Sequence, residues 1–326
     1  MSSFIHLHNH SDFSLLESAQ SIEAIVKRMD DLSMDTIALT EKGNLFSMIS
    51  FYKHAKQKGI KPIIGCEMNI VNNTNYIENQ RLVPHHHLIL LAKNNIGYLN
   101  LMKLVSLSYI NSPYDIPVIN KKLLKELSSG LIATSACLDG EITHYAAIGD
   151  YKNAKKIALE YHEIFNNNFY LEIQNHNIPE ELASHNILIK LSKELSIPLV
   201  ATNDTHYTFK EDAKSYDIIK CIGTGHNIND PNKGKQLPNE YYIKSTDEMY
   251  QLFKNCPQAI ENTIQISEKC NIDIPMGELF LPDFPIPKDS QISSADEYLK
   301  TLCNTNMLEK YNKITPEINN RLEYEL

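Results

Sequence analysis

Residues 36–71 read TIALTEKGNLFSMISFYKHAKQKGIKPIIGCEMNIV, and this stretch contains the repeating unit of the expected fold. The runs at 36–40 and 61–71 are apolar and typical of strands, whereas the pattern at 45–58 between them has helical periodicity. Strands that alternate with helices usually form a sheet with the helices packed outside it. The stretch therefore predicts a strand, a helix and a second strand of an α/β domain.

The same alternation extends to both sides of this unit. Further β-rich runs lie at 4–8, 87–92, 130–136, 169–174 and 197–202, so the sequence predicts seven strands. A helix is expected after Ser21, a predicted N-cap, and others at 95–108, 152–166, 181–195, 246–254 and 257–269. We expect a mostly parallel sheet, either doubly wound or closed as a barrel, because the pattern alone does not distinguish these two.

The last third of the chain has a different composition. Residues 223–240 are rich in Gly, Asn, Pro and Lys, which is typical of a long surface loop. Proline-rich residues at 275–294 predict a linker between a domain at 1–274 and a new element that starts near Ala295. The chain ends at RLEYEL without a helix-terminating signal, so 295–326 is interpreted as the start of a truncated domain.

The composition predicts a globular protein of the cytoplasm. The 326 residues are 42% hydrophobic and include neither an apolar run of membrane-spanning length nor a signal peptide at the start. The six cysteines show no CxxC spacing and are expected to be reduced thiols. A net charge of -9 argues against a surface built mainly to hold nucleic-acid phosphates. If DNA is the substrate, other parts must bind it.

Histidine placement gives the first indication of chemistry. His6, His8 and His10 alternate, and in a strand alternate side chains share a face, so all three are expected to point the same way. Two imidazoles at the end of a strand can chelate one metal ion, although a surface histidine cluster is the alternative. A second group is consecutive, at 85–87.

Other potential ligands come directly after the apolar parts of predicted strands, which read PIIGC, IATSA and LVATN. They are Glu67, Cys137, Asp204 and His206. The carboxyl ends of parallel strands form the rim of the active site in α/β proteins, so these side chains are expected to meet. Imidazole, carboxylate and thiolate suit Zn, Mn or Fe, and a mixed set of this size suggests more than one ion.

The chain contains, in this order, the segments HLHNHSDFSLL, ALTEKGNLFSMISFYKHAKQKGIKPIIGCE, HHLILLAKNNIGYLNLMKLVS, SACLDGE and ATNDTHY. In order and spacing they resemble the motifs of the PHP domain of bacterial DNA polymerase III alpha subunits. Downstream stretches such as CIGTGHNINDPNKGK are similar to that polymerase family and not to free-standing PHP phosphatases. The resemblance implies a distorted seven-stranded β/α barrel of TIM-like type. A short α-rich segment would then lead into a truncated polymerase palm domain at 295–326.

The resemblance also implies a set of ligands for two divalent ions at one mouth of the barrel. The first ion would be held by His8, His10, Glu67 and Asp204, and the second by Glu67, His87 and Cys137.

A third ion of active relatives would need Glu17, His206 and a histidine in the motif TDHG, which here reads TEKG with Lys42 in place of the histidine. A protonated ammonium group has no lone pair for a metal. We expect the two-ion core to survive, with Lys42 either weakening the third site or replacing the positive charge of that ion. The alternative is that Lys42 points to solvent and the third site is lost.

Several placements remain open at this point. His87 begins its strand whereas the other ligands follow theirs, so His85 or His86 could act instead. Cys137 could be an inert buried thiol. His226, in the polar loop, is a candidate phosphate contact, and isolated histidines such as His176 are interpreted as surface residues.

The expected reaction is metal-dependent phosphoester hydrolysis, because two adjacent ions can activate water and bind a phosphoryl group. The resemblance implies 3′-5′ exonuclease activity on mispaired primer ends, or pyrophosphate hydrolysis. The parent polymerase would synthesise DNA with Mg bound in its palm, beyond residue 326, so this chain alone is not expected to polymerise. Expected partners are the DNA primer 3′ end, other replisome subunits, a proofreading exonuclease subunit and the sliding clamp, with no membrane.

Two other functions remain open. The domain could brace the polymerase and dock a separate proofreading exonuclease without chemistry of its own. It could also be a free-standing PHP phosphatase acting on a small phosphomonoester, but that interpretation leaves residues 216–326 without a reason.

Overall fold

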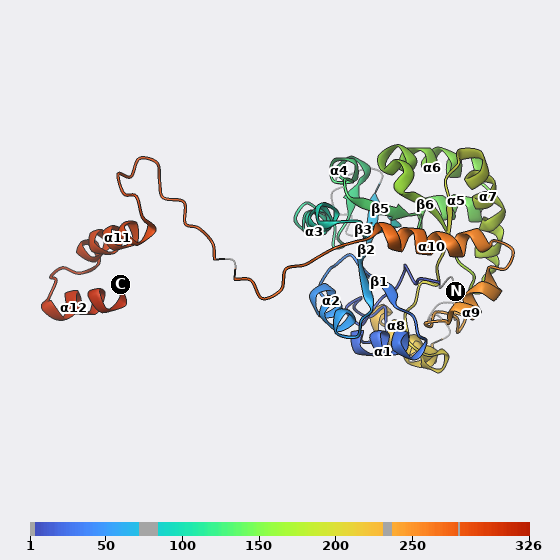
Figure 1. The fold of residues 1–326 in the computed structure, drawn as a ribbon, viewed down its shortest axis with the longest axis horizontal. Helices are drawn as coiled ribbons and strands as arrows, with labels where there is room; N and C mark the ends of the chain where they lie inside the picture. The colour runs from blue at the N-terminus through green and yellow to red at the C-terminus, as the bar shows by residue number, and fades with distance from the viewer. Residues whose placement is uncertain (1–3, 72–83, 231–236, 280) are drawn as a thin grey trace. The chain divides into compact units, whose positions relative to one another are not determined.

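The computed structural model describes residues 4–71, 84–230, 237–279 and 281–326. The chain divides into two compact units, Met1–Ile274 and Pro275–Leu326. The first unit contains every strand of the described residues (Figure 1).

One mixed sheet forms the centre of the first unit. Its strands are β1 (Thr36–Lys42), β2 (Lys61–Val71), β3 (His86–Ala92), β4 (Ile119–Asn120), β5 (Leu131–Thr134), β6 (Phe169–Ile173) and β7 (Leu199–Ala201). The order is β1-β2-β3-β5-β6-β7, and the short β4, which sequence analysis missed, pairs with β2.

The sheet is mostly parallel, as predicted, but β3 runs in the opposite direction. β1 pairs with β2, β5 with β6, and β6 with β7 in parallel. β3 is antiparallel to both β2 and β5. The apolar pattern of a strand contains no information on its direction, which is why the sequence did not show this reversal.

The N-terminal segment closes the sheet into a barrel without forming a regular strand. It pairs with β1 through a bridge between His6 and Ile37, and with the chain beyond β7 through a bridge between Asn9 and Thr205. A bend at His8 separates these bridges. The prediction of a regular strand at 4–8 was therefore wrong, although this segment takes the seventh position in the barrel.

The interior of the barrel has its own apolar cluster, to which the N-terminal segment and six strands contribute. Its buried members are Ile5, Leu7, Ala38, Ile63, Ile89, Leu91, Ile132, Ala136, Tyr170, Val200, Ile266 and Cys270. A larger cluster fills the layer between the strands and the outer helices. The two clusters are what a closed barrel requires, because each strand buries one face inside and one outside.

Helices surround the barrel (Figure 1). They are α1 (Ile22–Asp31), α2 (Met48–Gln57), α3 (Asn95–Ile110), α4 (Lys121–Glu126), α5 (Glu141–Ala147), α6 (Tyr151–Phe165), α7 (Pro179–Leu195), α8 (Ala213–Thr224), α9 (Thr246–Leu252) and α10 (Pro257–Lys269). Ser21 caps α1 as predicted, since its side chain accepts a hydrogen bond from the Ala24 amide. Sequence analysis missed α4, α5 and α8. The predicted loop at 223–240 starts later than expected because α8 extends to Thr224, and its residues 231–236 lie outside the described residues.

The second unit contains α11 (Ala295–Lys310) and α12 (Pro316–Glu325). Ser294 and Thr315 cap these helices by accepting hydrogen bonds from Glu297 N and Ile318 N. None of the residues described in either helix is buried, so within its described part this unit has no core of its own. Across the described residues of both units, no helix combines the length and apolar character needed to cross a membrane.

Candidate metal centre

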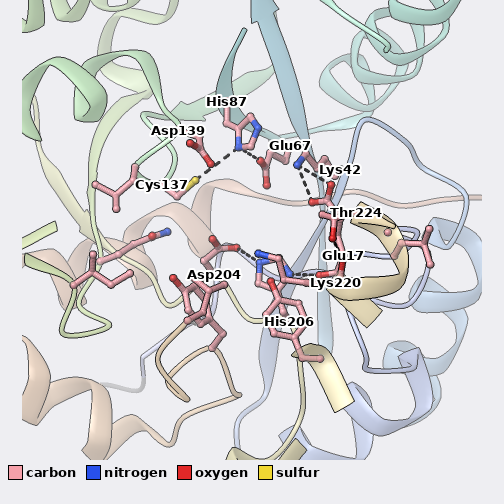
Figure 2. Close-up of a pocket in the computed structure, with 18 of the residues that line it drawn as sticks. Glu17, Lys42, Glu67, His87, Cys137, Asp139, Asp204, His206, Lys220 and Thr224 are labelled. Carbon is pink, nitrogen blue, oxygen red and sulfur yellow. Dashed lines mark hydrogen bonds and ion pairs between the residues drawn. The ribbon is translucent and has the colours of Figure 1, made fainter. Parts of the chain in front are cut away.

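Histidine, carboxylate and thiol side chains meet at one mouth of the barrel. His8 and His10 come from the N-terminal segment, Glu67 from β2, His87 from β3, and Asp204 from the turn after β7. Figure 2 shows Glu67, His87 and Asp204 pointing into one cavity. The structure thus brings together side chains that lie up to about 200 residues apart in sequence because each lies near the same edge of the barrel.

The first group of donors comprises His8, His10, Glu67 and Asp204, whose ligand atoms all lie within 4.8 Å of one another. His8 Nε2 is 3.2 Å from Glu67 Oε2 and 3.1 Å from Asp204 Oδ1. His10 Nε2 is 3.0 Å and 3.3 Å from the same two oxygens. All four residues are buried, so their donors converge in a small volume shielded from water.

The second group comprises Glu67, His87 and Cys137, again with donors within 4.8 Å of one another. The other oxygen of Glu67, Oε1, contacts His87 Nδ1. Cys137 Sγ lies 3.7 Å from that same nitrogen. Glu67 is therefore common to both groups and presents one carboxylate oxygen to each.

The reversed direction of β3 explains the position of His87. Because β3 is antiparallel to β2 and β5, its beginning lies at the edge where β2 and β5 end. A ligand at the start of β3 therefore lies near Glu67 in the second half of β2 and near Cys137 just beyond the end of β5. Of the three consecutive histidines, His87 contacts Glu67, whereas His86 Nδ1 lies 3.2 Å from the carbonyl oxygen of Asp139.

Two buried polar atoms in the first group lack hydrogen bonds of acceptable geometry within the described residues. They are His10 Nε2 and Asp204 Oδ1, despite their short separation. A buried polar atom without a partner is costly, and a metal ion could accept a lone pair from each of these two atoms. The donor set therefore fits a cation between these residues.

The electrostatics of the first group favour ionised carboxylates. Burial alone raises the pKa of Glu67, but the neighbouring His87, His10 and His8 outweigh it and hold this pKa well below its usual range. Burial lowers the pKa of His10, but Asp204 and Glu67 outweigh it and raise the pKa to about 9. Metal binding at these imidazoles would therefore release protons.

Cys137 is a half-buried free thiol. Burial and the negative charges of Asp204 and Glu67 raise its pKa well above the ordinary value. It is therefore protonated when no metal is bound, and becoming a thiolate ligand would require the charge of the metal itself.

Glu172 in β6 was missed by sequence analysis. It is fully buried, and its Oε1 lies 2.8 Å from His8 Nδ1. Gln174 donates to the same carboxylate, and so do Thr134 and Thr202. A carboxylate on one imidazole nitrogen makes that nitrogen the donor and leaves Nε2 with its lone pair, as in metal-bound histidines. No short motif marks Glu172, because a glutamate in a buried strand shows its role only through its partners.

Ser14 positions His10 in a similar way. Its hydroxyl lies 3.1 Å from His10 Nδ1 and donates to the buried Glu41 carboxylate. Glu41 also accepts hydrogen bonds from Ser11 and Ser47. The glutamate of the TEKG motif is thus part of the support of the cluster and not one of its donors.

Lys42 does not point freely to solvent. Its Nζ lies 2.7 Å and 3.0 Å from the two carboxylate oxygens of Glu17. Burial lowers the pKa of Lys42, but the charges of Glu67 and Glu17 outweigh it and raise the pKa above its ordinary value, so the side chain stays an ammonium ion. His206 Nε2 lies 3.1 Å from Asp204 Oδ1, and its Nδ1 lies 2.6 Å from the Glu17 carbonyl oxygen. Glu17, Lys42 and His206 thus line the cavity together.

Hydrogen bonds to the neighbouring Asn203 stabilise the turn that carries Asp204. Asp204 has a φ of 44°, in the left-handed region that non-glycine residues rarely adopt. The preceding Asn203 accepts a hydrogen bond from the buried Lys244 ammonium, at 3.0 Å. His176 Nε2 lies 2.9 Å from the Asn203 carbonyl oxygen, and its Nδ1 lies 2.7 Å from Glu181. The interpretation of His176 as a surface residue was wrong, since it is fully buried beneath this turn.

Two other histidines lie apart from the cluster. His6 is buried, but its Nε2 lies 2.8 Å from the Lys244 carbonyl oxygen. The expectation that His6 shares a direction with His8 and His10 was wrong, because the bend at His8 interrupts the alternation of a strand. His226 lies 3.2 Å from Asp230 and is not among the residues that line the cavity.

The cavity has a volume of about 530 Å³, which is in the range of small-molecule sites. One wall carries the donors Glu67, His87, Cys137 and Asp204. Another is formed by residues of α8, Tyr216, Lys220, Gly223 and Thr224, and by Tyr241 nearby in the fold. Sequence analysis missed this wall together with α8.

Comparisons with known proteins agree with the motifs. The family model described as PHP domain matches residues 6–176. The DNA polymerase III subunit alpha of Borreliella burgdorferi is 44% identical over 328 residues, which cover 100% of this chain and 28% of that protein. The one from Helicobacter pylori is 44% identical over 286 residues, 84% of this chain and 24% of that protein. The chain thus spans about a quarter of the length of these curated relatives.

A solved structure of a two-domain protein from Bacteroides vulgatus, which contains a predicted PHP-like metal-dependent phosphoesterase, matches with a TM-score of 0.40 and 14% identity. The match covers 76% of this chain and 62% of that one. The family model alone matches about half of the chain, and its match includes His8, His10, Glu67, His87 and Cys137. The chain therefore belongs to the PHP domain family.

Proposed function

We propose that the cavity binds two divalent metal ions and hydrolyses phosphoesters. His8, His10, Glu67 and Asp204 would hold the first ion, and Glu67, His87 and Cys137 the second. The observation that carries the proposal is the shared, buried Glu67, which presents one oxygen to each donor group. A carboxylate shared between two donor groups is the arrangement expected at a two-metal site.

Bound together, the two ions would supply an activated water and stabilise the charge of the phosphoryl group. The residues of the chain then have separate tasks. Glu172 orients His8, Ser14 orients His10, and the Lys42 ammonium adds a fixed positive charge beside Glu67. Imidazole, carboxylate and thiolate together favour Zn, Mn or Fe over Mg or Ca.

The similarity to DNA polymerase III alpha subunits supports a role in DNA replication. We infer that the site removes mispaired nucleotides from a primer 3′ end, or hydrolyses pyrophosphate, as part of a larger DNA-directed DNA polymerase. That polymerase would use Mg for synthesis and act in the cytoplasm with DNA, other replisome subunits, a proofreading exonuclease subunit and the sliding clamp. A free-standing phosphatase remains a weaker proposal, because the similarity to polymerase subunits extends far beyond residue 176.

A hydrolysis assay tests this proposal. The purified chain is loaded with Mn or Zn, incubated with a DNA primer that carries a 3′ mismatch, and then chelated and reloaded. We expect trimming that stops on chelation and returns with metal. If the chain neither trims the primer nor hydrolyses pyrophosphate with any of the metals, the proposed reaction is contradicted.

The ion pair between Lys42 and Glu17 favours a second candidate function, that of a docking domain without hydrolytic activity. The ion pair with Glu17 places an ammonium where the family pattern has a ligand. In that case the chain would bind metal ions and a proofreading exonuclease but would trim no primer.

Replacing Glu172 with glutamine is expected to weaken metal binding about 10- to 100-fold, because this carboxylate orients the His8 imidazole. A competition titration against a chelating dye measures the change. Glu163→Gln serves as the control and should have no effect, because Glu163 lies on α6 and forms an exposed ion pair with Lys125 of α4. Equal affinities of the Glu172 variant and the wild type would show that His8 needs no such partner.

Replacing Lys42 with histidine is expected to add about one bound ion per chain, since it supplies a lone pair beside Glu17 and His206 in place of an ammonium. Elemental analysis measures the number of ions. Lys42→Met is the matched control, because it removes the charge without offering a strong ligand. If both variants bind as many ions as the wild type, Lys42 does not occupy a third metal position.

A further inference from the structure

The α8 wall of the cavity, defined as Tyr216, Lys220, Gly223 and Thr224, has no part in the proposed metal centre. Rings connect it to that centre in a continuous stack. His10 stacks on His206 with ring centroids 4.7 Å apart, and His206 stacks on Tyr216 at 5.1 Å. Lys220 Nζ lies 5.6 Å from the centre of the Tyr216 ring. Lys220 is thus separated from the first donor group by two stacked rings.

Lys220 differs from the other lysine of the cavity. The ammonium of Lys42 is neutralised by Glu17, at 2.7 Å. Lys220 is half-buried and forms no ion pair with any of the residues that the structure describes. A half-buried ammonium whose main contact is an aromatic ring keeps its capacity to bind an anion. Figure 2 shows both lysines among the residues around the cavity.

Close packing fixes the position of α8. Gly223 lies against the loop that carries Glu17, and a Cβ added at Gly223 would be only 3.1 Å from Leu16 Cβ. Because Lys220 lies one turn before Gly223 on the same helix, its distance from the donor groups is set by this contact. Tyr216 contributes a phenol whose pKa is raised by burial and by the charges of Asp204 and Glu17, so its hydroxyl remains a donor.

We propose that Lys220 binds a second phosphate of the substrate, next to the one that is hydrolysed, and thereby selects a nucleic-acid strand over a small phosphomonoester. This inference rests on the proposed function and adds a specificity-determining residue to it. A cavity of about 530 Å³ is far larger than a single phosphate group, and its lining includes both the acidic donors and Lys220, whose ammonium lies 5.6 Å from the centre of the Tyr216 ring. A substrate with one phosphate leaves Lys220 unused, whereas a strand brings a neighbouring phosphate to it.

Lys220→Met tests the inference, because methionine keeps an unbranched stem over Tyr216 and removes only the charge. Two substrates are compared in the Mn-loaded chain: a short single-stranded DNA, and bis(p-nitrophenyl) phosphate, which has a single phosphate. We expect the variant to raise KM for the DNA about tenfold with kcat and metal content unchanged. The slope of log Kd for DNA against log salt concentration should become smaller by about one, which corresponds to the loss of one phosphate contact. KM and kcat for bis(p-nitrophenyl) phosphate should stay within about twofold of the wild-type values. Lys220→Arg should restore most of the affinity.

Lys214→Met is the control, since Lys214 is an exposed lysine of the same helix outside the cavity lining. Lys214→Met should leave KM and kcat unchanged for both substrates. Fluorescence anisotropy of a labelled DNA strand reports binding without hydrolysis, so it separates the two proposals. If the wild type hydrolyses neither substrate, the proposed function fails, and weaker DNA binding by the Lys220 variant still supports the inference. Equal DNA binding by the wild type and Lys220→Met, or equal losses on both substrates, would overturn it.

Discussion

Replacing Glu67 with glutamine is expected to cause a large loss of hydrolysis and to weaken metal binding at both positions. Glu67 contributes an oxygen to each donor group, so one substitution removes a charged ligand from two ions at once. Metal ions supply several kcal/mol of stabilisation to the charge that develops during phosphoryl transfer, and each 1.4 kcal/mol corresponds to about tenfold in rate. We therefore expect kcat/KM to fall at least about 1000-fold, and metal content to fall from about two ions per chain to fewer than one.

Kinetics with the mismatched primer, together with elemental analysis, measure both effects. Glu261→Gln is a matched control, because Glu261 is an exposed glutamate of α10 outside the cavity. A Glu67 variant that keeps both ions, or that loses less than about tenfold in rate, would show that Glu67 is not the shared ligand.

Metal ions are expected to raise the thermal stability of the first unit strongly. Without metal, two buried carboxylates and several imidazoles crowd a small volume, and some of their atoms lack hydrogen bonds to any residue that the structure describes. An ion present at about 1,000 times its dissociation constant stabilises the folded state by about 4 kcal/mol. In a domain of this size each kcal/mol raises the midpoint by roughly 2 °C or more, so two ions should raise Tm by at least about 10 °C.

Differential scanning calorimetry of the chain before and after chelation measures this shift. The Glu67→Gln variant should show less than about half of it, because its ions bind weakly. A chelated wild type that unfolds at the same temperature as the loaded one would mean that the cluster binds no ion tightly.

Much of this fold follows from local patterns that the sequence shows directly. Apolar runs predicted the positions of six of the strands, and helical periodicity together with Ser21 predicted α1. The rule that ligands gather where parallel strands end predicted that Glu67, Cys137 and Asp204 would lie at one rim. The strands and α1 depend on residues that are close in sequence, which is why they can be predicted, and the shared rim follows from the general geometry of α/β folds.

The features that the sequence did not show depend on residues far apart. The direction of β3, which decides whether His87 reaches the rim, comes from its pairing with β2 and β5. The role of Glu172 is visible only from its distance to His8. The role of His176 is visible only from its contact with Asn203, in the turn that carries Asp204. The His8 bend that turns His6 away is set by bridges to β1 and to the chain after β7. Long-range pairing of this kind has no local sequence pattern.

Anomalous X-ray scattering from crystals of the Mn- or Zn-loaded chain would locate the ions themselves. We expect two peaks roughly 3.5–4 Å apart on either side of the Glu67 carboxylate. One should lie among His8, His10 and Asp204, and the other beside His87 and Cys137. A single peak, or peaks away from Glu67, would contradict a two-metal site that shares this carboxylate.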